Sequence, residues 1–435
     1  MSAKRLRSKE RASIIQSLKA GVTPRIGIQH IQVGRAEEIK ALDRDIEMIA
    51  QGGAAFRLIV GEYGSGKTFF LGVVRAVALE KGLVSVNADL SPDRRIHASG
   101  GQARSLYSEL MLSLATRNKP EGKALGGVVE RFVNAARQEA EGKNLSVSSL
   151  IQDRLSSLRD HVGGYDFAKV VEAYWEGHES GNDELMANAL RWLRAEYSTR
   201  TDARNALGVR TIISDTSFYD SLKIMSLFVR QAGYGGLLVC LDEAVNLYKL
   251  NSKQARESNY EQILRILNDC LQGNTDHLGF LMGGTPDFLL DTRKGLYSYE
   301  ALQSRLAENT FAQKASRVDY SSPVLRLDNL TPEELYILLK NIRNVFASGD
   351  KTKHLVPDEA LEAFLRHCDR TIGAAYFKTP RTTVKAFTDM LSLLEQNENM
   401  RWDDLIGSIE ILEDKPSDMP EVEDSSDDFG DFALK

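Results

Sequence analysis

The stretch Gly61-Glu-Tyr-Gly-Ser-Gly-Lys-Thr68 decides the fold of this chain. Its pattern is a glycine, four residues, and then Gly-Lys followed by Ser or Thr, which is typical of phosphate-binding loops. Glycines permit backbone angles that turn successive N–H groups toward one anion. The lysine ammonium reaches the outer phosphates, and the threonine hydroxyl is a ligand for Mg²⁺. We therefore predict that this loop binds a nucleoside triphosphate.

The neighbours of the loop favour this interpretation over a glycine turn with an ordinary surface lysine. Phe56–Val60 reads as a buried strand, and Thr68–Lys81 reads as a helix that Gly82 ends. The positive end of that helix then faces the phosphates. The predicted nucleotide contacts within this stretch are Gly61, Glu62, Tyr63, Gly64, Ser65, Gly66, Lys67, Thr68 and Phe69.

An acidic pair ends a second apolar run, Leu237-Leu-Val-Cys-Leu-Asp242-Glu243. Ligands of open α/β sheets collect at the carboxyl ends of the strands. We expect Asp242 to hold Mg²⁺ together with Thr68, and Glu243 to orient or deprotonate the attacking water. The alternative is that Asp242 and Glu243 only cap the next helix. The prediction is ATP hydrolysis with ATP and Mg²⁺ bound.

Strands and helices alternate through the first three quarters of the chain, which favours an α/β fold with a parallel sheet. Further strands are expected at 83–90, 209–213, 236–241 and 278–282. Helices are expected at 36–50, 218–230, where Ser217 and Asp220 have capping-box spacing, and 260–271. Residues 101–208 are rich in helix formers and read as a large helical insertion.

The ends of the chain differ in composition. Residues 1–30 form a basic arm with a short helix, 31–322 the nucleotide-binding core, and 323–412 an all-α lid with helices at 332–346, 357–368 and 380–394. Between residues 413 and 431, nine acids and Lys415 give a net charge of −8, so the total of −6 leaves the rest of the chain at +2. The acidic tail, 413–435, is expected to be disordered.

Other classes of protein have little support. No apolar run approaches the roughly 18 residues of a membrane-spanning helix, and the N-terminus lacks the apolar core of a secretory signal. Cys240, Cys270 and Cys368 have no disulfide, redox or zinc spacing. The seven histidines show no ligand spacing, and no serine elbow appears. We expect a reduced cytoplasmic protein with no membrane association.

With the phosphate loop and the acidic strand in place, the chain resembles the AAA+ P-loop ATPases, which carry an additional strand between those two. Val33-Gly34-Arg35 resembles the adenine-side motif of initiator-type members, and Leu330-Thr-Pro-Glu-Glu334 resembles the start of the lid. The resemblance implies that Thr285 is the sensor 1 residue, that Arg305 is an arginine finger, and that Arg381 is the sensor 2 arginine. Arg317 competes with Arg305 for the finger role, and a finger implies a homo-oligomer.

Longer segments resemble the BrxD family of ATP-binding proteins in bacterial BREX phage-exclusion systems. They include Ala88-Asp-Leu-Ser-Pro-Asp-Arg-Arg95, Cys240-Leu-Asp-Glu-Ala-Val-Asn-Leu-Tyr248 and Gly283-Gly-Thr-Pro-Asp-Phe-Leu289. The resemblance implies a bacterial ATPase of anti-phage defence with other defence proteins as partners.

Three functions remain open: an ATPase that remodels a complex, a slow ATP-gated switch, and an ATP-controlled DNA-binding module. For DNA, the basic arm and the insertion charges Arg131, Arg137, Lys143, Arg154 and Arg159 are the candidate surfaces, with a solvated helix face as the alternative. The tail, with Phe429, Phe432 and Leu434, is either a docking peptide or a solubilising segment.

Overall fold

The computed structural model describes residues 6–315, 317–397 and 399–407. The acidic tail, 413–435, lies outside the described residues. The described residues form two compact units: 6–40, 59–76 and 325–407 make the first, and 41–58 and 77–324 make the second. Among the described residues, no helix has the length and apolar composition needed to cross a lipid bilayer.

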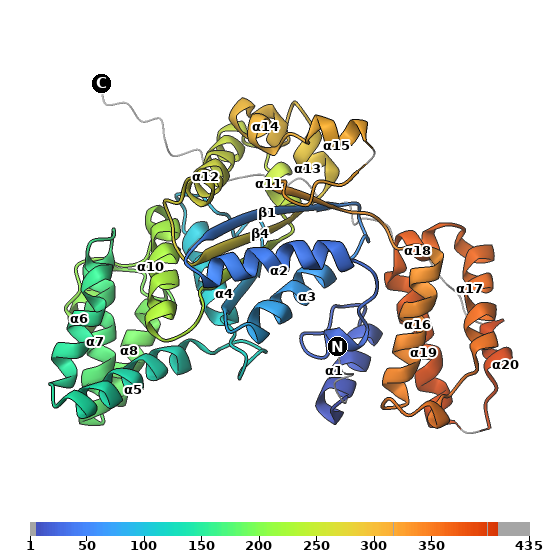
Figure 1. Cartoon of the computed structure of the whole chain (residues 1–435), viewed down its shortest axis with the longest axis horizontal. Coiled ribbons are helices and arrows are strands. Elements are labelled where there is room, and N and C mark those ends of the chain that lie inside the picture. Colours follow the sequence, from blue (N-terminus) through green and yellow to red (C-terminus); the bar gives the residue numbers. More distant parts are fainter. Residues whose placement is uncertain (1–5, 316, 398, 408–435) are drawn as a thin grey trace. The chain divides into compact units, whose positions relative to one another are not determined.

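A five-stranded sheet in the order β2-β3-β4-β1-β5 confirms the α/β expectation (Figure 1). The strands are β1 Ala54–Gly61, β2 Val84–Asp89, β3 Leu237–Asp242, β4 Leu278–Gly284 and β5 Val324–Leu327. β2 pairs with β3, and β3 with β4, in parallel. In this order β4 stands between β1, which leads into the phosphate loop, and β3, which ends in the acidic pair.

The strands of the second unit are almost wholly buried, which is why they read as continuous apolar runs. The register sets Asp89, the last residue of β2, opposite Asp242, the last residue of β3. The helices that follow the strands in this unit are α11 Val245–Tyr248, α12 Lys253–Gln272, α13 Pro286–Leu290, α14 Glu300–Leu306 and α15 Thr310–Lys314. Helices α2 Ala36–Ala50 and α3 Lys67–Glu80 flank β1 in the chain.

Only helices occur between β2 and β3 apart from isolated bridges, and all residues of this segment are described. They are α4 Gln102–Ser113, α5 Leu125–Lys143, α6 Val147–Arg159, α7 Gly164–Ser180, α8 Asp183–Leu193, α9 Arg200–Leu207 and α10 Phe218–Gln231. Figure 1 shows α5 to α8 grouped beside α10. The rings of Phe132 and Phe167 each lie 5.3 Å from that of Phe228 on α10, so aromatic packing joins the insertion to α10.

Two local predictions in this region are wrong. Residues 209–213 form no strand, because Asp166 of α7 accepts hydrogen bonds from the backbone N–H groups of Arg210 and Thr211 and so takes the donors that a ladder would use. The Ser217 hydroxyl does not cap α10. It bonds to the backbone of Ser214 instead, and the capping box belongs to the 3₁₀ turn Asp215–Ser217.

The first unit holds a helical bundle, drawn in orange and red in Figure 1, where α16 and α19 lie side by side. Its helices are α16 Pro332–Phe346, α17 Asp358–Ile372, α18 Ala375–Lys378, α19 Pro380–Gln396 and α20 Trp402–Ile406. The bounds of α16 are those predicted. The short strand β5 was missed, since four residues give too little periodicity to recognise.

The N-terminal helix α1, Ser8–Lys19, packs in the same bundle against α16 and α19. Ile14 is fully buried in the bundle core. Arg11 donates hydrogen bonds of 3.1 and 2.9 Å to the carbonyl oxygen of Phe346 and pairs with Glu395. This basic residue of the N-terminal arm therefore forms its hydrogen bonds and ion pair within the bundle.

Candidate nucleotide-binding site

The phosphate loop joins β1 to α3 and has the backbone of an anion nest. Gly64 and Gly66 have φ values of 79° and 84°, in the left-handed region that side chains disfavour. The Ser65 N–H donates to Glu62 O at 3.2 Å, and the Phe70 N–H donates to Gly66 O at 2.8 Å, which opens a helix of 14 residues. A loop of this shape at the N-terminus of a long helix is suited to phosphate.

Close packing also explains the first glycine. A Cβ on Gly61 would collide with Ser65 Oγ and lie 3.0 Å from the carbonyl oxygen of Leu327 in β5. Lys67 Nζ donates to the carbonyl oxygens of Gly61 at 2.8 Å and Glu62 at 2.9 Å, which holds the ammonium over the loop. The predicted residues 61–68 therefore fit a triphosphate: they combine left-handed glycines, a helix start and a cation.

The start of α19 lies against the same loop. A Cβ on Gly64 would come within 2.9 Å of Thr379 Cα, so only a glycine allows this approach. Arg381, in the first turn of α19, donates from Nη1 to Tyr63 Oη over 3.4 Å, and its guanidinium carbon lies 5.9 Å from the Tyr63 ring centroid. The structure thus brings Arg381 to the phosphate loop. Nothing in the local sequence indicated the contact with Tyr63.

The adenine-side motif belongs to the first unit as well. Gly34 and Arg35 both have a φ of 61°, and a Cβ on Gly34 would collide with the carboxylate of Glu334 in the first turn of α16. Arg35 donates to the carbonyl oxygen of Asp328 and lies 3.7 Å from Glu38. Its side chain thus links this predicted adenine-side motif to the segment that precedes α16.

Apolar side chains of these motifs contribute to the bundle. Val33 and Phe69 pack, partly buried, against the core cluster of the first unit. The structure therefore places Val33–Arg35, Gly61–Phe69 and Arg381 in one compact unit, in which Arg381 contacts the phosphate loop.

The acidic pair lies in the second unit, at the end of β3. Asp242 is buried, with an exposed fraction of 7%, and its Oδ1 accepts the Glu243 N–H at 2.8 Å. Glu243 has a φ of 57°, an unusual conformation for this residue type that turns the chain sharply out of the strand. Asp89 ends the neighbouring strand. Sequence reasoning missed Asp89, because the strand was predicted to continue to Leu90 and the structure ends it at Asp89.

Thr285 follows β4 and caps α13. Its Oγ1 accepts the Phe288 N–H at 3.3 Å. The Ala244 N–H donates to Gly283 O at 2.9 Å, so the turn after β3 and the end of β4 are adjacent. The structure therefore brings Glu243 and Thr285 into neighbouring loops.

The two finger candidates are exposed. Arg305 on α14 donates from Nε to Asn268 Oδ1 at 2.6 Å and from Nη1 to Ala301 O at 2.9 Å. Arg317 lies in the segment after α15. The side chain of Asn309, which precedes α15, donates a hydrogen bond of 2.8 Å to the Asp319 carboxylate and so joins the two ends of the stretch that contains α15 and Arg317.

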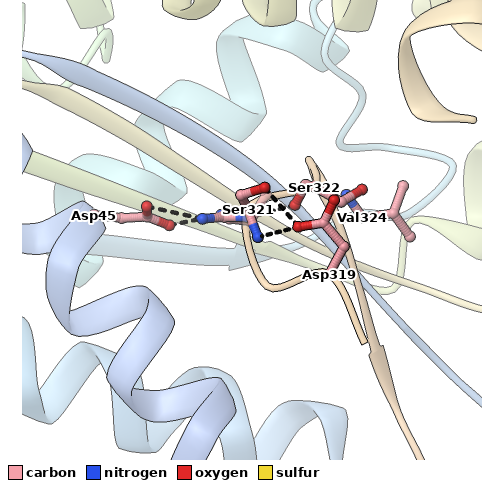
Figure 2. A network of polar contacts seen from close by, with 6 residues as sticks. Asp45, Asp319, Ser321, Ser322 and Val324 are labelled. Atoms are coloured by element: carbon pink, nitrogen blue, oxygen red, sulfur yellow. Dashed lines mark hydrogen bonds and ion pairs between the residues drawn. The ribbon is translucent and has the colours of Figure 1, made fainter. Parts of the chain in front are cut away.

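A polar network anchors the segment beside β1 (Figure 2). Arg57, buried in β1, makes a bidentate pair with Asp45 of α2 at 2.6 and 2.9 Å and donates to the carbonyl oxygen of Ser322. Ser321 and then Asn309 donate to the Asp319 carboxylate and hold its pKa below the usual value. The chain that follows the finger candidates is thus fixed in the second unit.

The basic residues proposed as a DNA surface have partners. Lys143 and Arg154 donate to Glu139 and hold its pKa below the usual value. The others are likewise paired: Arg137 with Glu141, Arg159 with Glu172, and Arg131 with the Tyr234 ring. These charges form ion pairs and a cation–π contact along the insertion.

Among the residues the structure describes, no group of three or more His, Cys, Asp and Glu is arranged to hold a metal ion. A magnesium ion at this kind of site takes most of its ligands from phosphates and water and only one or two from the protein. The Thr68 hydroxyl and the Asp242 carboxylate, the two predicted ligands, are hard oxygen donors, and each is described only within its own unit.

Comparison with known proteins identifies the family. No curated protein and no solved structure matches the chain. Residues 6–410 match the family described as BREX system ATP-binding protein BrxC/D. That match includes the phosphate loop, the acidic pair and the helical bundle. The chain therefore belongs to the BrxC/D family of BREX system ATP-binding proteins.

Proposed function

We propose that this protein is a Mg²⁺-dependent ATPase whose hydrolysis cycle moves the lid and remodels a protein or DNA complex in BREX defence against phage. The observation that carries the proposal is the phosphate loop itself. Its left-handed glycines, the Lys67 ammonium and the first turn of α19 with Arg381 gather around one anion-binding backbone. We expect the protein to act in the cytoplasm, beside other proteins of the defence system.

Each residue has a distinct role in this proposal. The amides of residues 61–68 and Lys67 bind the phosphates, and Val33–Arg35 with Phe69 line the adenine side. Thr68 and Asp242 hold Mg²⁺, which offsets the charge of the phosphates. Glu243 accepts the proton of the attacking water. Thr285 and Arg381 contact the γ-phosphate or the water.

An arginine supplied by a neighbouring copy completes the proposed site. Arg305 is the first candidate because α14 exposes it and Asn268 fixes its direction, and Arg317 is the second. Such an arginine stabilises charge that develops on the γ-phosphate. The expected result is that Arg305→Ala lowers the ATPase rate only at concentrations where the protein assembles.

A second candidate function is an ATP-gated switch with slow hydrolysis. The contacts of Tyr63 and Gly64 with the start of α19 favour this switch. Through them, ATP bound to the loop can shift the proposed lid between conformations without being hydrolysed. A DNA-binding role has less support, because the candidate basic residues of the helical insertion are paired within the chain.

Turnover separates the two functions. We expect Glu243→Gln to keep ATP affinity and lower kcat by about 10²- to 10⁴-fold, as for loss of a general base. Lys67→Ala should weaken ATP binding itself. Glu257→Gln, which removes a carboxylate of α12, is the matched control. ATP binding by calorimetry and phosphate release with and without Mg²⁺ are the measurements.

Equal rates for the wild type and Glu243→Gln would remove the enzyme proposal. The switch would remain if ATP still changed the mass of the protein in light scattering. If ATP fails to bind the wild type, both functions are excluded.

A further inference from the structure

Tyr63 occupies the third position of the phosphate loop, where a backbone-only role demands no particular side chain. In this chain the position carries a half-buried aromatic ring. The ring lies beside the Arg381 guanidinium, with 5.9 Å from centroid to Cζ, and the hydroxyl is 3.4 Å from Nη1. A cation beside an aromatic ring is attracted by the quadrupole of the ring. Tyr63 therefore contacts the one lid arginine that the proposed function assigns to the nucleotide.

The aliphatic part of the Arg381 side chain lies near a different segment of the chain, at Gly21. Its Cγ and Cδ atoms lie 3.7 and 3.8 Å from the position that a Cβ on Gly21 would occupy. Gly21 has a φ of 68° and follows α1. The aliphatic part of the arginine thus lies beside the chain after α1, and its charged end lies beside Tyr63. An exposed arginine has many rotamers, and these two contacts restrict them.

The neighbouring loop residue strengthens the link. Thr379 packs on Gly64 so closely that any Cβ there would contact it at 2.8 to 3.0 Å. Two consecutive residues of the phosphate loop, 63 and 64, thus contact residues 381 and 379 at the start of α19. The position of the arginine is tied to the backbone that binds the phosphates.

We propose that Tyr63 is a positioning residue that aims Arg381 at the γ-phosphate and so lets the phosphate loop distinguish ATP from ADP. The inference rests on the proposed function, in which Arg381 contacts that phosphate. Tyr63 acts through the arginine, so its effect must disappear when the arginine is absent.

The test compares the affinities of ADP and a non-hydrolysable ATP analogue by calorimetry. Tyr63→Leu keeps bulk but has no π face, and Tyr63→Phe keeps the ring without the hydroxyl. We expect Tyr63→Leu to lower analogue affinity about two- to fivefold, the range of an exposed cation–π contact, and to leave ADP affinity unchanged. Tyr63→Phe should retain most of the preference for the analogue. In an Arg381→Ala background, Tyr63→Leu should have no further effect.

Tyr336→Leu is the matched control. The Tyr336 ring also lies near a cation, with Lys340 Nζ 6.0 Å from its centroid, but both residues are on α16, outside the phosphate loop. This variant should change neither affinity. The inference is overturned if Tyr63→Leu weakens both nucleotides equally, if it changes neither, or if its effect persists without Arg381. If Tyr63→Leu fails to fold, a Tyr63→Phe variant that loses the preference as fully as Arg381→Ala contradicts the role of the ring. A wild type that binds neither nucleotide refutes the proposed function instead.

Discussion

Two strand-to-helix junctions of this protein both contain glycines, but they differ in backbone conformation and in the length of the helix that follows. β1 runs into Gly61–Gly66, and β4 ends in Gly283-Gly284 before Thr285. At the first junction, Gly64 and Gly66 adopt left-handed angles and open a helix of 14 residues. At the second, Thr285 is extended, its hydroxyl caps the next turn, and the helix has five residues.

At the second junction, Gly284 allows close packing. A Cβ on Gly284 would lie 2.6 Å from the Phe288 ring. Glycine content alone therefore does not make an anion site. The left-handed pair followed by a long helix does, because it directs backbone N–H groups and the helix dipole to one point.

The sharpest test of this difference is a pair of alanine variants with the same backbone cost. Gly66 and Gly82 have φ values of 84° and 83°, and a Cβ on either meets nothing within 4 Å. Each change should cost about 1–2 kcal/mol of strain. We expect Gly66→Ala also to lower ATP affinity at least about tenfold, since the loop relaxes to relieve the strain.

Gly82→Ala, at the end of α3, should lower the melting temperature and leave ATP affinity unchanged. Thermal melting and calorimetry on both variants measure this. Equal ATP affinities in the two variants would contradict the assignment of the first junction as the phosphate site.

A second test concerns the second junction, where Thr285 has both a capping role and a proposed contact with the nucleotide. Thr285→Ala removes the cap at a cost of about 1 kcal/mol. Thr285→Asp keeps a good cap but adds a negative charge. If the residue faces the γ-phosphate, Thr285→Asp should lower kcat at least about tenfold with a normal melting temperature.

Thr285→Ser should restore both properties. A Thr285→Asp enzyme as active as the wild type would leave Thr285 with the cap alone. Phosphate release and thermal melting, measured on the same preparations, separate the two roles.

The smallest effect concerns the bond that joins α11 to the end of α13. Tyr248 Oη donates to Asp291 Oδ2 at 3.0 Å. The Arg293 N–H and then this hydroxyl hold the pKa of Asp291 below its usual 3.8, while burial and then Asp291 raise the pKa of Tyr248 above its usual 10.0. The contribution of Asp291 to stability is thus present above pH 3.8 and lost as the pH falls through its lower folded pKa.

Tyr248→Phe should slightly lower the melting temperature at neutral pH. The difference from the wild type should shrink as the solution is acidified below the folded pKa of Asp291. It should also shrink in strong alkali, as the pH rises through the raised pKa of Tyr248. A difference that is constant across the acid range would show that Asp291 is not the partner that matters. Melting followed by circular dichroism over a pH series is the measurement.

Local signals explain which elements were predictable. The start of α16 follows from Thr331, Pro332 and Glu334, whose capping box and first-turn proline act within four residues. The strands β3 and β4 were recognised because burial on both faces leaves continuous apolar runs. The phosphate loop was recognised because the backbone angles of the loop require glycines at fixed positions, which gives a pattern within eight residues.

Competing hydrogen bonds explain the failures. Val209–Ile213 is apolar enough for a strand, but Asp166 takes its backbone donors from more than forty positions earlier in the chain. Ser217 has the spacing of a helix cap, but its hydroxyl bonds to the backbone of Ser214 in the preceding turn. In each case a competing hydrogen bond prevailed: at residues 209–213 its acceptor lies on a distant helix, and at Ser217 its partner lies only three residues away.

By itself, the sequence determined the α/β class, the phosphate loop and the acidic pair, because these depend on backbone angles, burial and residue chemistry within short windows. Tertiary structure alone decided that α1 packs in the helical bundle of the first unit, that Thr379 lies against Gly64, and that Tyr63 contacts Arg381. Those contacts join residues more than 300 positions apart in the chain, as between Tyr63 and Arg381, separated by 318. Packing of whole helices sets such pairs, and no local pattern encodes it.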